Sequence, residues 1–225
     1  MPEPASPKSA RGEQTRAAIV TAALELFRER GYEKTTMRAI ADSAGVSLGN
    51  AYYYVASKEH LIQAFYDRMQ VEHEAQAAIV LADETTFLRR LAGVQEAFFD
   101  VAAPYHEFAG KFFKNAAEPA SPLSPFSPES EPAREASIAI FRQVVVGSDL
   151  KAPAAILIEL PELLWLMHMG YVLFWVHDTS DGQRRTRLLV QRGGALVDRL
   201  VRLTRLPGVR GVAEDVMGLV RTLKA

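Results

Sequence analysis

The sequence contains no cysteine, which excludes disulfide bonds, thiolate metal ligands and a cysteine nucleophile. Long apolar runs are also scarce. The longest, Leu163 to Val176, has 14 residues, whereas a membrane span needs about 20. The first ten residues hold three prolines and no apolar stretch of the kind that a signal peptide has. We therefore expect a cytoplasmic protein without a membrane segment.

Catalytic motifs are missing as well. The chain has no G-x-S-x-G elbow, no P-loop and no G-x-G-x-x-G. The segment 106–110 (HEFAG) begins like the zinc motif H-E-x-x-H, but a glycine stands in place of the second histidine. Five scattered histidines without cysteine do not indicate a structural metal. We predict that the protein is not an enzyme and uses neither a metal nor a cofactor.

The composition is that of a globular protein, with 48% hydrophobic and 24% charged residues in 225 and a net charge of −1. The charge is unevenly spread. Residues 8–58 carry eight Lys and Arg against five Asp and Glu, whereas the rest of the chain has an excess of acids. This asymmetry indicates that a nucleic-acid-binding surface, if present, lies in the N-terminal part.

Apolar residues recur at helical spacing along nearly the whole chain, and no stretch alternates with a period of two. This pattern predicts an all-α fold. In the N-terminal part we place helix starts, caps and turns at Gln14, Gly31, Thr35, Gly45, Ser47 and Ser57. Further helical patterns cover residues 61–81, 87–101, 108–117, 138–146, 163–176, 188–203 and 212–223.

The domain division follows from these patterns. We expect a disordered arm over residues 1–12, a three-helix DNA-binding domain over 13–58, and a larger helical-bundle domain over 59–225 for effector binding and dimerisation. Prolines recur every third residue between Pro119 and Pro128, so residues 119–132 should form an extended, polyproline-like surface loop. A proline-rich docking motif is the alternative.

Three short helices with a glycine-containing turn before the third are typical of a helix-turn-helix, whose recognition helix enters the major groove. Here that helix would run from Ser47 to Val55, with Ala51 and Val55 as its buried positions. The Asn50 amide can pair with adenine, Leu48 can contact a thymine methyl, and Arg38 can reach guanine. A purely structural helical hairpin, with its tyrosines half-buried in packing, fits the same pattern.

The residues themselves resemble the signature of the TetR family of bacterial regulators. Residues 35–47 (TTMRAIADSAGVS) resemble its T-x-R/x-I-A-x-x-A-G-V-S motif, residues 50–55 (NAYYYV) its recognition helix, and residues 57–59 (SKE) the start of its next helix. Residues 23–27 and 31–32 also match. The resemblance covers about residues 13–65, and Ala51 and Val55 depart from it by being smaller than the usual apolar residues.

The resemblance implies specific DNA contacts. Base or groove contacts would come from Arg38, Leu48, Gly49 and Asn50. Phosphate contacts would come from Thr36, Ser47, Tyr52, Tyr54 and Lys58. Tyr53 is ambiguous because the family varies at that position.

In the larger domain, residues 163–176 are apolar on every side, so a helix there must be covered all round. One face carries two indoles and an imidazole, the other Met167, Gly170, Tyr171 and Phe174. A packed core without a cavity explains such a stripe, but the resemblance to TetR proteins implies an apolar effector between helices. The candidate effector-binding residues are Phe98, His106, Phe112, Trp165, His168, Val172 and Trp175.

The helix predicted near residues 184–204 has an apolar seam flanked by arginines. The TetR resemblance implies that this helix and the 163–176 helix build a four-helix dimer interface, while intramolecular packing is the alternative. The candidate interface residues are Leu189, Gly193, Leu196, Val197 and Leu200.

Together these features predict a homodimeric transcription regulator of double-stranded operator DNA, a repressor that a small apolar or amphipathic effector releases. A DNA-binding protein without an effector, controlled by a protein partner, is the first alternative. A carrier of hydrophobic ligands with vestigial N-terminal helices is the second.

Overall fold

The computed structural model describes residues 10–116, 118 and 121–206, with isolated positions beyond at 208, 209, 211, 215, 218 and 222. No strand occurs in this part of the chain, as the sequence predicts. The contacts divide the chain into two compact units: residues 1–69 with 107–130, and residues 70–106 with 131–225. The chain therefore passes between the units at 69–70, 106–107 and 130–131.

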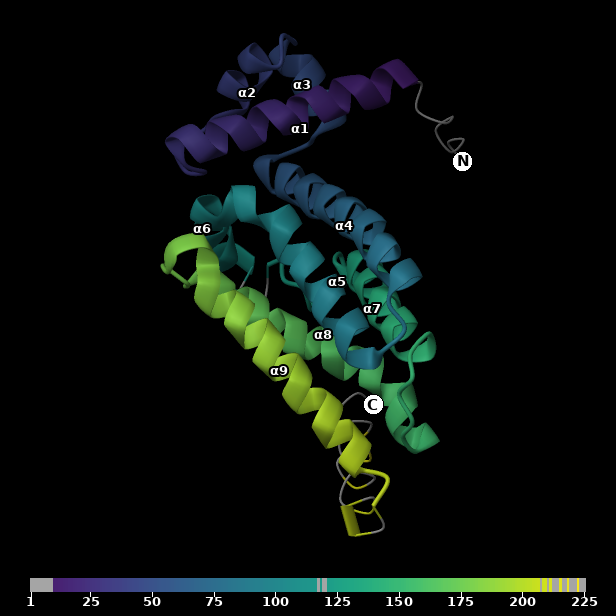
Figure 1. Cartoon of the computed structure of the whole chain (residues 1–225). Coiled ribbons are helices and arrows are strands. Elements are labelled where there is room, and N and C mark those ends of the chain that lie inside the picture. The colour runs from purple at the N-terminus through teal and green to yellow at the C-terminus, as the bar shows by residue number, and fades with distance from the viewer. Residues whose placement is uncertain are drawn as a thin grey trace, which may run out of the picture. The chain divides into compact units, whose positions relative to one another are not determined.

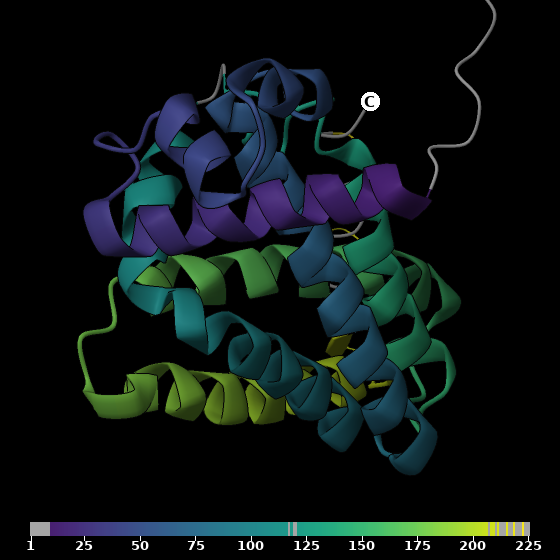
Figure 2. The ribbon, with the colours of Figure 1, turned by 90° about the horizontal axis from the view of Figure 1, so that it is seen from above.

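The first unit begins with α1 (Ala10–Arg30), against which α2 (Met37–Ser43) and α3 (Leu48–Tyr54) pack (Figures 1 and 2). Ile19, Ala23 and Phe27 of α1 are fully buried, which matches their helical spacing. The helix ends where predicted, at Gly31, whose φ of +81° suits glycine. It starts earlier than predicted, so residues 10–12 of the expected arm are helical; residues 1–9 lie outside the described part.

The cap of α2 differs from the prediction by one residue. Thr36 is the cap, and its hydroxyl oxygen accepts a hydrogen bond from the Ala39 N–H at 3.2 Å. Thr35 is buried instead and donates its hydroxyl to the carbonyls of Gly31 (2.8 Å) and Leu26 (3.3 Å). Thr35 thus ties the end of α1 to the start of α2, a role that the local pattern does not distinguish from capping.

The helix α4 (Lys58–Asp83) starts directly after Ser57 and runs from the first unit into the second. The first unit also contains α6 (His106–Ala116) from Glu107 onward, and the segment that follows it. The expected boundary near residue 58 does not coincide with this division, because α6 and residues 121–130 associate with the N-terminal helices.

Residues 121–130 are not an extended polyproline segment. They form a chain of tight turns at three-residue intervals, in which the N–H groups of Ser121, Ser124 and Ser127 each donate to the carbonyl three residues earlier. Ser124, Ser127 and Ser130 are buried, and Ser127 donates its hydroxyl to the Pro122 carbonyl at 3.0 Å. Pro132 already belongs to α7 (Glu131–Val146), at a position where a helix accepts proline.

The second unit is built from the end of α4, α5 (Phe87–Ala102), the short 3₁₀ turn η1 (Ala103–Tyr105), α7, α8 (Ala154–Val176), the 3₁₀ turn η2 (Asp181–Gln183) and α9 (Arg184–Leu203). Within it α5 packs on α7 and α9, and α8 packs on α7 and α9 (Figure 1). The helix predicted over 212–223 lies largely outside the described residues.

The helix α8 is longer than the apolar run predicts, with 23 residues and Pro161 inside it. Its length and apolar composition alone would allow it to cross a membrane, so the 14-residue run underestimates the length of the apolar helix. In the structure Leu164, Trp165 and Trp175 are buried within the second unit, as in the core helix of a globular domain.

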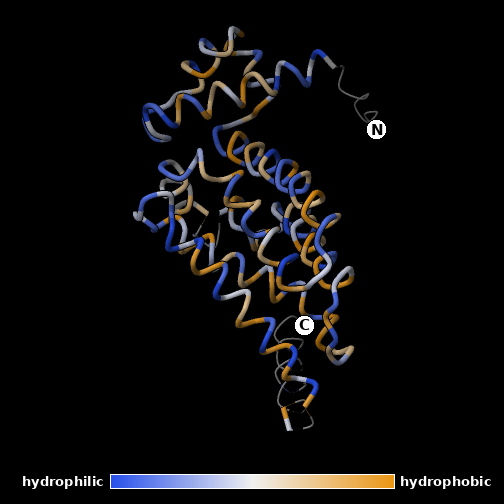
Figure 3. The backbone as a smooth tube through the Cα atoms, viewed as in Figure 1, coloured by the Kyte–Doolittle hydropathy of each residue, from blue (hydrophilic) through white to orange (hydrophobic). Residues whose placement is uncertain are grey.

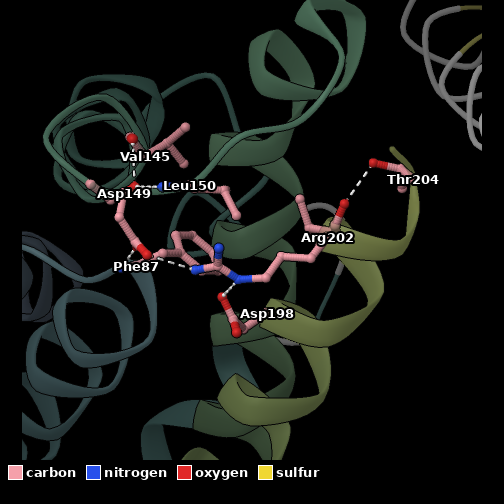
Figure 4. A network of polar contacts seen from close by, with 9 residues as sticks. Phe87, Val145, Asp149, Leu150, Asp198, Arg202 and Thr204 are labelled. Carbon is pink, nitrogen blue, oxygen red and sulfur yellow. Dashed lines mark hydrogen bonds and ion pairs between the residues drawn. The ribbon is translucent and has the colours of Figure 1, made fainter. Parts of the chain in front are cut away.

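Asp149 joins three elements of the second unit (Figure 4). Its carboxylate accepts a hydrogen bond from the Phe87 N–H at 2.8 Å, at the first residue of α5. It also pairs at 3.0 Å with Arg202 of α9, which is bonded to Asp198 at 2.8 Å. The pKa of Asp149 is lowered, and the largest cause is the hydrogen bond from the Phe87 N–H. One carboxylate therefore caps α5 and holds the end of α9.

Arg90 is buried without a carboxylate partner among the described residues. Its guanidinium donates to the carbonyls of Leu81 (2.8 Å) and Glu84 (2.6 Å) at the end of α4, and to that of Gln143 (2.9 Å) in α7. These carbonyls lie at helix ends, where the helix dipole is negative, and that of Gln143 also accepts from the Gly147 N–H at 3.1 Å. A methyl group on Gly147 would collide with the guanidinium, so a larger residue there would displace Arg90 from these carbonyls.

Arg90→Met should lower the free energy of unfolding by about 2–4 kcal/mol, because three partly buried carbonyls lose a charged donor. Arg89→Met is the matched control, since Arg89 is exposed and pairs with Glu84 only at 3.5 Å; it should cost about 0.5 kcal/mol or less. Urea denaturation measures both. Equal losses for the two variants would contradict the role of Arg90.

Candidate nucleic-acid interface and aromatic core

The helices α2 and α3 are held in place by apolar side chains on their buried faces. Met37, Ile40 and Ala41 of α2 are buried, and so are Ala51 and Val55 of α3, as predicted. The turn between the helices is closed by N–H donation from residue 46 to the Ala41 carbonyl at 3.0 Å. The small residues at 51 and 55 bring α3 close to its neighbours, and the opposite face of α3 is left outside.

That outer face begins at the N-terminus of α3. Ser47, Gly49 and Asn50 are exposed there, and Leu48 is half-buried. A methyl group on Gly49 would meet nothing within 4 Å, so neither backbone conformation nor packing inside the chain requires a glycine. A missing side chain at an exposed helix start permits close approach by another molecule.

Thr36 and Ser47 hold equivalent places at the starts of α2 and α3. The Ser47 hydroxyl oxygen accepts from the Asn50 N–H at 3.1 Å, as Thr36 does from Ala39. Each hydroxyl is thereby oriented by its acceptor role and keeps its own hydrogen to donate outward. Both groups can therefore cap a helix and donate to an external oxygen at the same time.

The tyrosines of α3 differ in exposure. Tyr53 is 81% exposed and Tyr52 48%, whereas Tyr54 is half-buried and packs its ring edge against Tyr53 at 5.1 Å. The sequence did not single out Tyr53 as the most accessible. Arg38 is exposed on α2, so its guanidinium is available to a molecule that meets α2 and α3.

Lys58 has a contact inside the chain that the sequence did not reveal. Its ammonium donates to the Tyr32 carbonyl at 2.9 Å and lies 4.2 Å from the centre of the Tyr32 ring. The Tyr32 hydroxyl in turn donates to Glu59 at 3.1 Å. Burial, and then the Glu59 carboxylate, raise the pKa of Tyr32. Lys58 thus supports the end of α1 and retains N–H groups for another acceptor.

In the second unit an aromatic core surrounds His168, which is 1% exposed. The His168 ring lies 4.5 Å from Phe98, 5.6 Å from Phe141 and 6.0 Å from Phe99, and it stacks on His73 at 6.3 Å. Burial, and then His73, lower the pKa of His168 to about 3. His168 is therefore a neutral ring in an apolar setting.

The histidines of this region have different partners. Nε2 of His73 bonds to the Val94 carbonyl at 2.8 Å, and Nε2 of His106 bonds to the Trp175 carbonyl at 2.7 Å. A carbonyl only accepts, so these ring nitrogens are the donors. Nδ1 of His168 is buried and has no hydrogen-bond partner.

Gln95 of α5 is a feature that the sequence analysis missed. It is 0% exposed, and neither its amide nitrogen nor its amide oxygen has a hydrogen-bond partner. Gln95 lies one turn before Phe99 on the same face of α5. The sequence could have revealed it, because Gln95 interrupts an otherwise apolar stripe of α5 (Leu91, Gln95, Phe99, Ala102).

Several predicted effector residues come together in this core. Phe98 contacts His168, while Phe99 links His168 to Trp175 at 5.9 Å, and His106 meets Trp175 edge-on at 4.8 Å. Trp165 is buried one turn before His168, and Val172 is half-buried. The side chain of Phe112 lies outside the described part.

The predicted dimer residues are in two environments. Leu196 and Leu200 are 57% and 52% exposed, but Leu189 is half-buried and Val197 packs against the core of its own chain. We expected Gly193 to allow close contact with another subunit. In the structure Gly193 makes room within its own chain instead, because a methyl group there would collide with the Tyr171 hydroxyl. Tyr171 itself is buried and not on an outer face.

Further exposed apolar residues extend the surface around Leu196 and Leu200. In Figure 3 hydrophobic and hydrophilic stretches alternate along α9. The exposed large apolar side chains of the two helices are Leu188, Leu196, Leu200 and Leu203 on α9 and Ile158, Leu166, Leu173 and Phe174 on α8. We call this set the α8–α9 apolar surface.

Residues 19–65 match the family model of bacterial regulatory proteins of the tetR family, and residues 90–219 match that of the tetracyclin repressor-like C-terminal domain. Over 62 residues the chain is 39% identical to the HTH-type transcriptional regulator TtgR of Pseudomonas putida, a match that covers 28% of this chain and 30% of TtgR. The chain thus matches less than a third of the length of this relative.

Two solved structures have a similar fold. The TetR transcriptional regulator of Nitrosomonas europaea superposes with a TM-score of 0.61 at 20% identity, covering 81% of this chain and 97% of that one. The regulator FadR of Bacillus subtilis, solved with stearoyl-CoA, superposes with a TM-score of 0.57 at 20% identity, covering 79% and 98%.

A capped helix-turn-helix followed by an all-helical domain with an aromatic core defines a DNA-binding regulator of transcription. The chain belongs to the TetR family of transcriptional regulators, since the family models together match most of its length.

The buried neutral His168 should make the protein sensitive to acid. Its pKa lies below the ordinary value of 6.5 in the folded chain, so the unfolded chain takes up the proton first. Stability is therefore full above about pH 6.5 and falls as the pH drops towards 3, by up to about 1.4 kcal/mol per pH unit.

His168→Phe should flatten this loss between pH 6.5 and 4.5, as measured by urea denaturation at a series of pH values. His60→Phe is the control, because His60 is exposed and should leave the slope as it is. An unchanged slope in His168→Phe would show that the ring is not kept neutral by the fold.

Proposed function

We propose that the protein is a homodimeric repressor in the cytoplasm that binds a specific operator through α2 and α3 and leaves it when a small apolar or amphipathic effector binds the second unit. The observation that carries the DNA-binding part is the open start of α3. There Ser47 supplies a capping hydroxyl and Asn50 an exposed amide. Between them lies Gly49, a glycine that packing inside the chain does not require.

This arrangement suits the major groove. Gly49 lets the backbone approach the bases, and Asn50 offers the donor and acceptor pair that matches adenine. Arg38 from α2 and Leu48 would add guanine and thymine contacts. Thr36 and Ser47, whose hydroxyl hydrogens remain to be donated, would bind phosphates on either side, together with Tyr52, Tyr54 and Lys58.

The α8–α9 apolar surface supports a second copy of the chain as the partner. Eight large apolar side chains are exposed on these two helices, an arrangement that is unfavourable for a monomer in water. A symmetric pair would cover α8 on its remaining side, and a dimer that binds two half-sites needs recognition helices about 34–36 Å apart, the spacing of successive major grooves.

Effector control is supported by the aromatic core and by the connection of this core to α6. The FadR structure that resembles this chain was solved with stearoyl-CoA, an apolar chain on a polar carrier. In the present chain, His106 at the first residue of α6 bonds to the end of α8, and the chain enters the other unit at the next residue. A ligand that displaces Trp175 would thereby act on α6 as well as on α4.

A regulator without an effector, controlled by a protein partner, would use the same DNA contacts. It would differ in one observable: no apolar compound would change its operator affinity. Operator DNA selected from a random pool supplies the probe for this comparison and for the next prediction.

Asn50→Ala and Arg38→Ala should each weaken binding to the selected operator by about 1–3 kcal/mol and relax the base preference at one position. Lys58→Ala should weaken binding to all sequences and reduce the salt dependence. Gln76→Ala, an exposed change on α4, is the control. Thermal melting of each variant separates lost contacts from lost folding, which matters for Lys58 because of its bond to Tyr32.

If Lys58→Ala altered the base preference while Asn50→Ala did not, the division of roles between the two would be wrong. If no sequence were enriched from the random pool by the wild-type protein, sequence-specific DNA binding itself would be refuted.

Leu196→Glu should convert the dimer to a monomer at micromolar concentration and abolish operator binding, because it places a charge on the α8–α9 apolar surface. Light scattering measures the mass. Val71→Glu is matched to it, since Val71 is 64% exposed on α4 and lies outside that surface. Gly193→Leu is not a suitable probe, because it would disturb Tyr171 in its own chain. A Leu196→Glu protein that remains dimeric would move the interface elsewhere.

A further inference from the structure

Unsatisfied polar groups are concentrated in one part of the second unit. Among the described residues, four buried side-chain nitrogen or oxygen atoms have no hydrogen-bond partner, and three of them belong to Gln95 and His168. Buried polar atoms are normally paired, because leaving water without a new partner costs stability. An amide with both ends unpaired at 0% exposure requires an explanation beyond packing.

Helix register relates Gln95 to His168 through Phe99. Gln95 precedes Phe99 by one turn on one face of α5, and the ring of Phe99 lies 6.0 Å from that of His168 and 5.9 Å from that of Trp175. The other rings around His168 are those of Phe98, Phe141 and His73. Gln95 and His168 are thus the unpaired polar groups of an aromatic layer between α5 and α8.

This layer offers hydrogen bonds but no charge. The Gln95 amide both donates and accepts, and a neutral imidazole has one donor and one acceptor nitrogen. The guanidinium of Arg90, nearer the start of α5 than Gln95, is directed to the carbonyls of Leu81, Glu84 and Gln143. A carboxylate in the layer would lose its water without a cation in exchange, which is far more costly than burial of a neutral group.

We infer that Gln95 and His168 bind an uncharged hydrogen-bonding group, a hydroxyl or a carbonyl, on the otherwise apolar effector. The inference rests on the proposed effector-controlled function and specifies the chemical class of the effector. A saturated hydrocarbon chain would leave both side chains unpaired, and an anion would lack a counter-charge. A phenol, an alcohol or a ketone of compact apolar body meets both requirements.

Three matched probes test the class directly: butylbenzene, 4-butylphenol and 4-butylbenzoate share one apolar body and differ in one group. Isothermal calorimetry on the full-length protein should find 4-butylphenol bound about tenfold more tightly than butylbenzene, the value of one buried hydrogen bond. The benzoate should bind more weakly than either. Equal affinities, tighter binding of the benzoate, or no binding of any probe would overturn the inference.

Gln95→Leu links the preference to the named side chain. The variant should melt at a higher temperature without ligand, because an unpaired amide is replaced by an apolar group of similar size. It should also bind butylbenzene at least as tightly as 4-butylphenol. Gln191→Leu is the control, since Gln191 is exposed on α9 and should keep the wild-type preference. A tenfold preference that persists in Gln95→Leu would refute the role of Gln95.

His168→Phe provides a second variant that does not depend on folding of the first, and it should reduce the preference for 4-butylphenol. Operator binding without ligand is measured on the same samples. A full preference that persists in His168→Phe, or its absence in a wild-type protein with intact operator binding, would refute the inference alone, whereas absence of sequence-specific DNA binding in the wild-type protein would refute the proposed function.

Discussion

A helix that is apolar on all sides has to be covered on all sides, and α8 imposes this constraint on the second unit. One side of α8 is covered by α7 and α9, with Trp165, His168 and Trp175 buried. The other side exposes Ile158, Leu166, Leu173 and Phe174. The core and the proposed dimer surface are therefore two consequences of one sequence feature, and the boundary between them is set by how many helices a single chain can bring to α8.

The buried polar groups of the second unit fall into two kinds. Asp178 accepts four hydrogen bonds from Ser180 and Thr186 and fixes the start of α9; burial alone would raise the pKa of this carboxyl, but those bonds hold it below its ordinary value. Arg90 is likewise directed to carbonyls. Both are connectors between elements. Gln95 and His168 differ because the amide of Gln95 and Nδ1 of His168 have no hydrogen-bond partner.

The sequence was sufficient where a local pattern has one physical solution. The caps at Ser47, the glycine end of α1 at Gly31 and the buried positions Ala51 and Val55 all followed from spacing and residue type. It failed where the outcome depends on a distant partner. Neither the bond from Lys58 to the Tyr32 carbonyl nor the collision partner of Gly193 can be read from neighbours in the chain. The proline spacing also misled, because its regularity reflects repeated turns rather than an extended chain.

These turns have a consequence for how the segment can change in evolution. Residues 121–130 repeat a unit of three, and the serines at 124, 127 and 130 all face inward. Insertion or deletion of three residues would add or remove one unit and keep every remaining serine in place. A change of one or two residues would put a residue other than serine at these inward positions. The length of this segment should therefore vary among related proteins in steps of three residues.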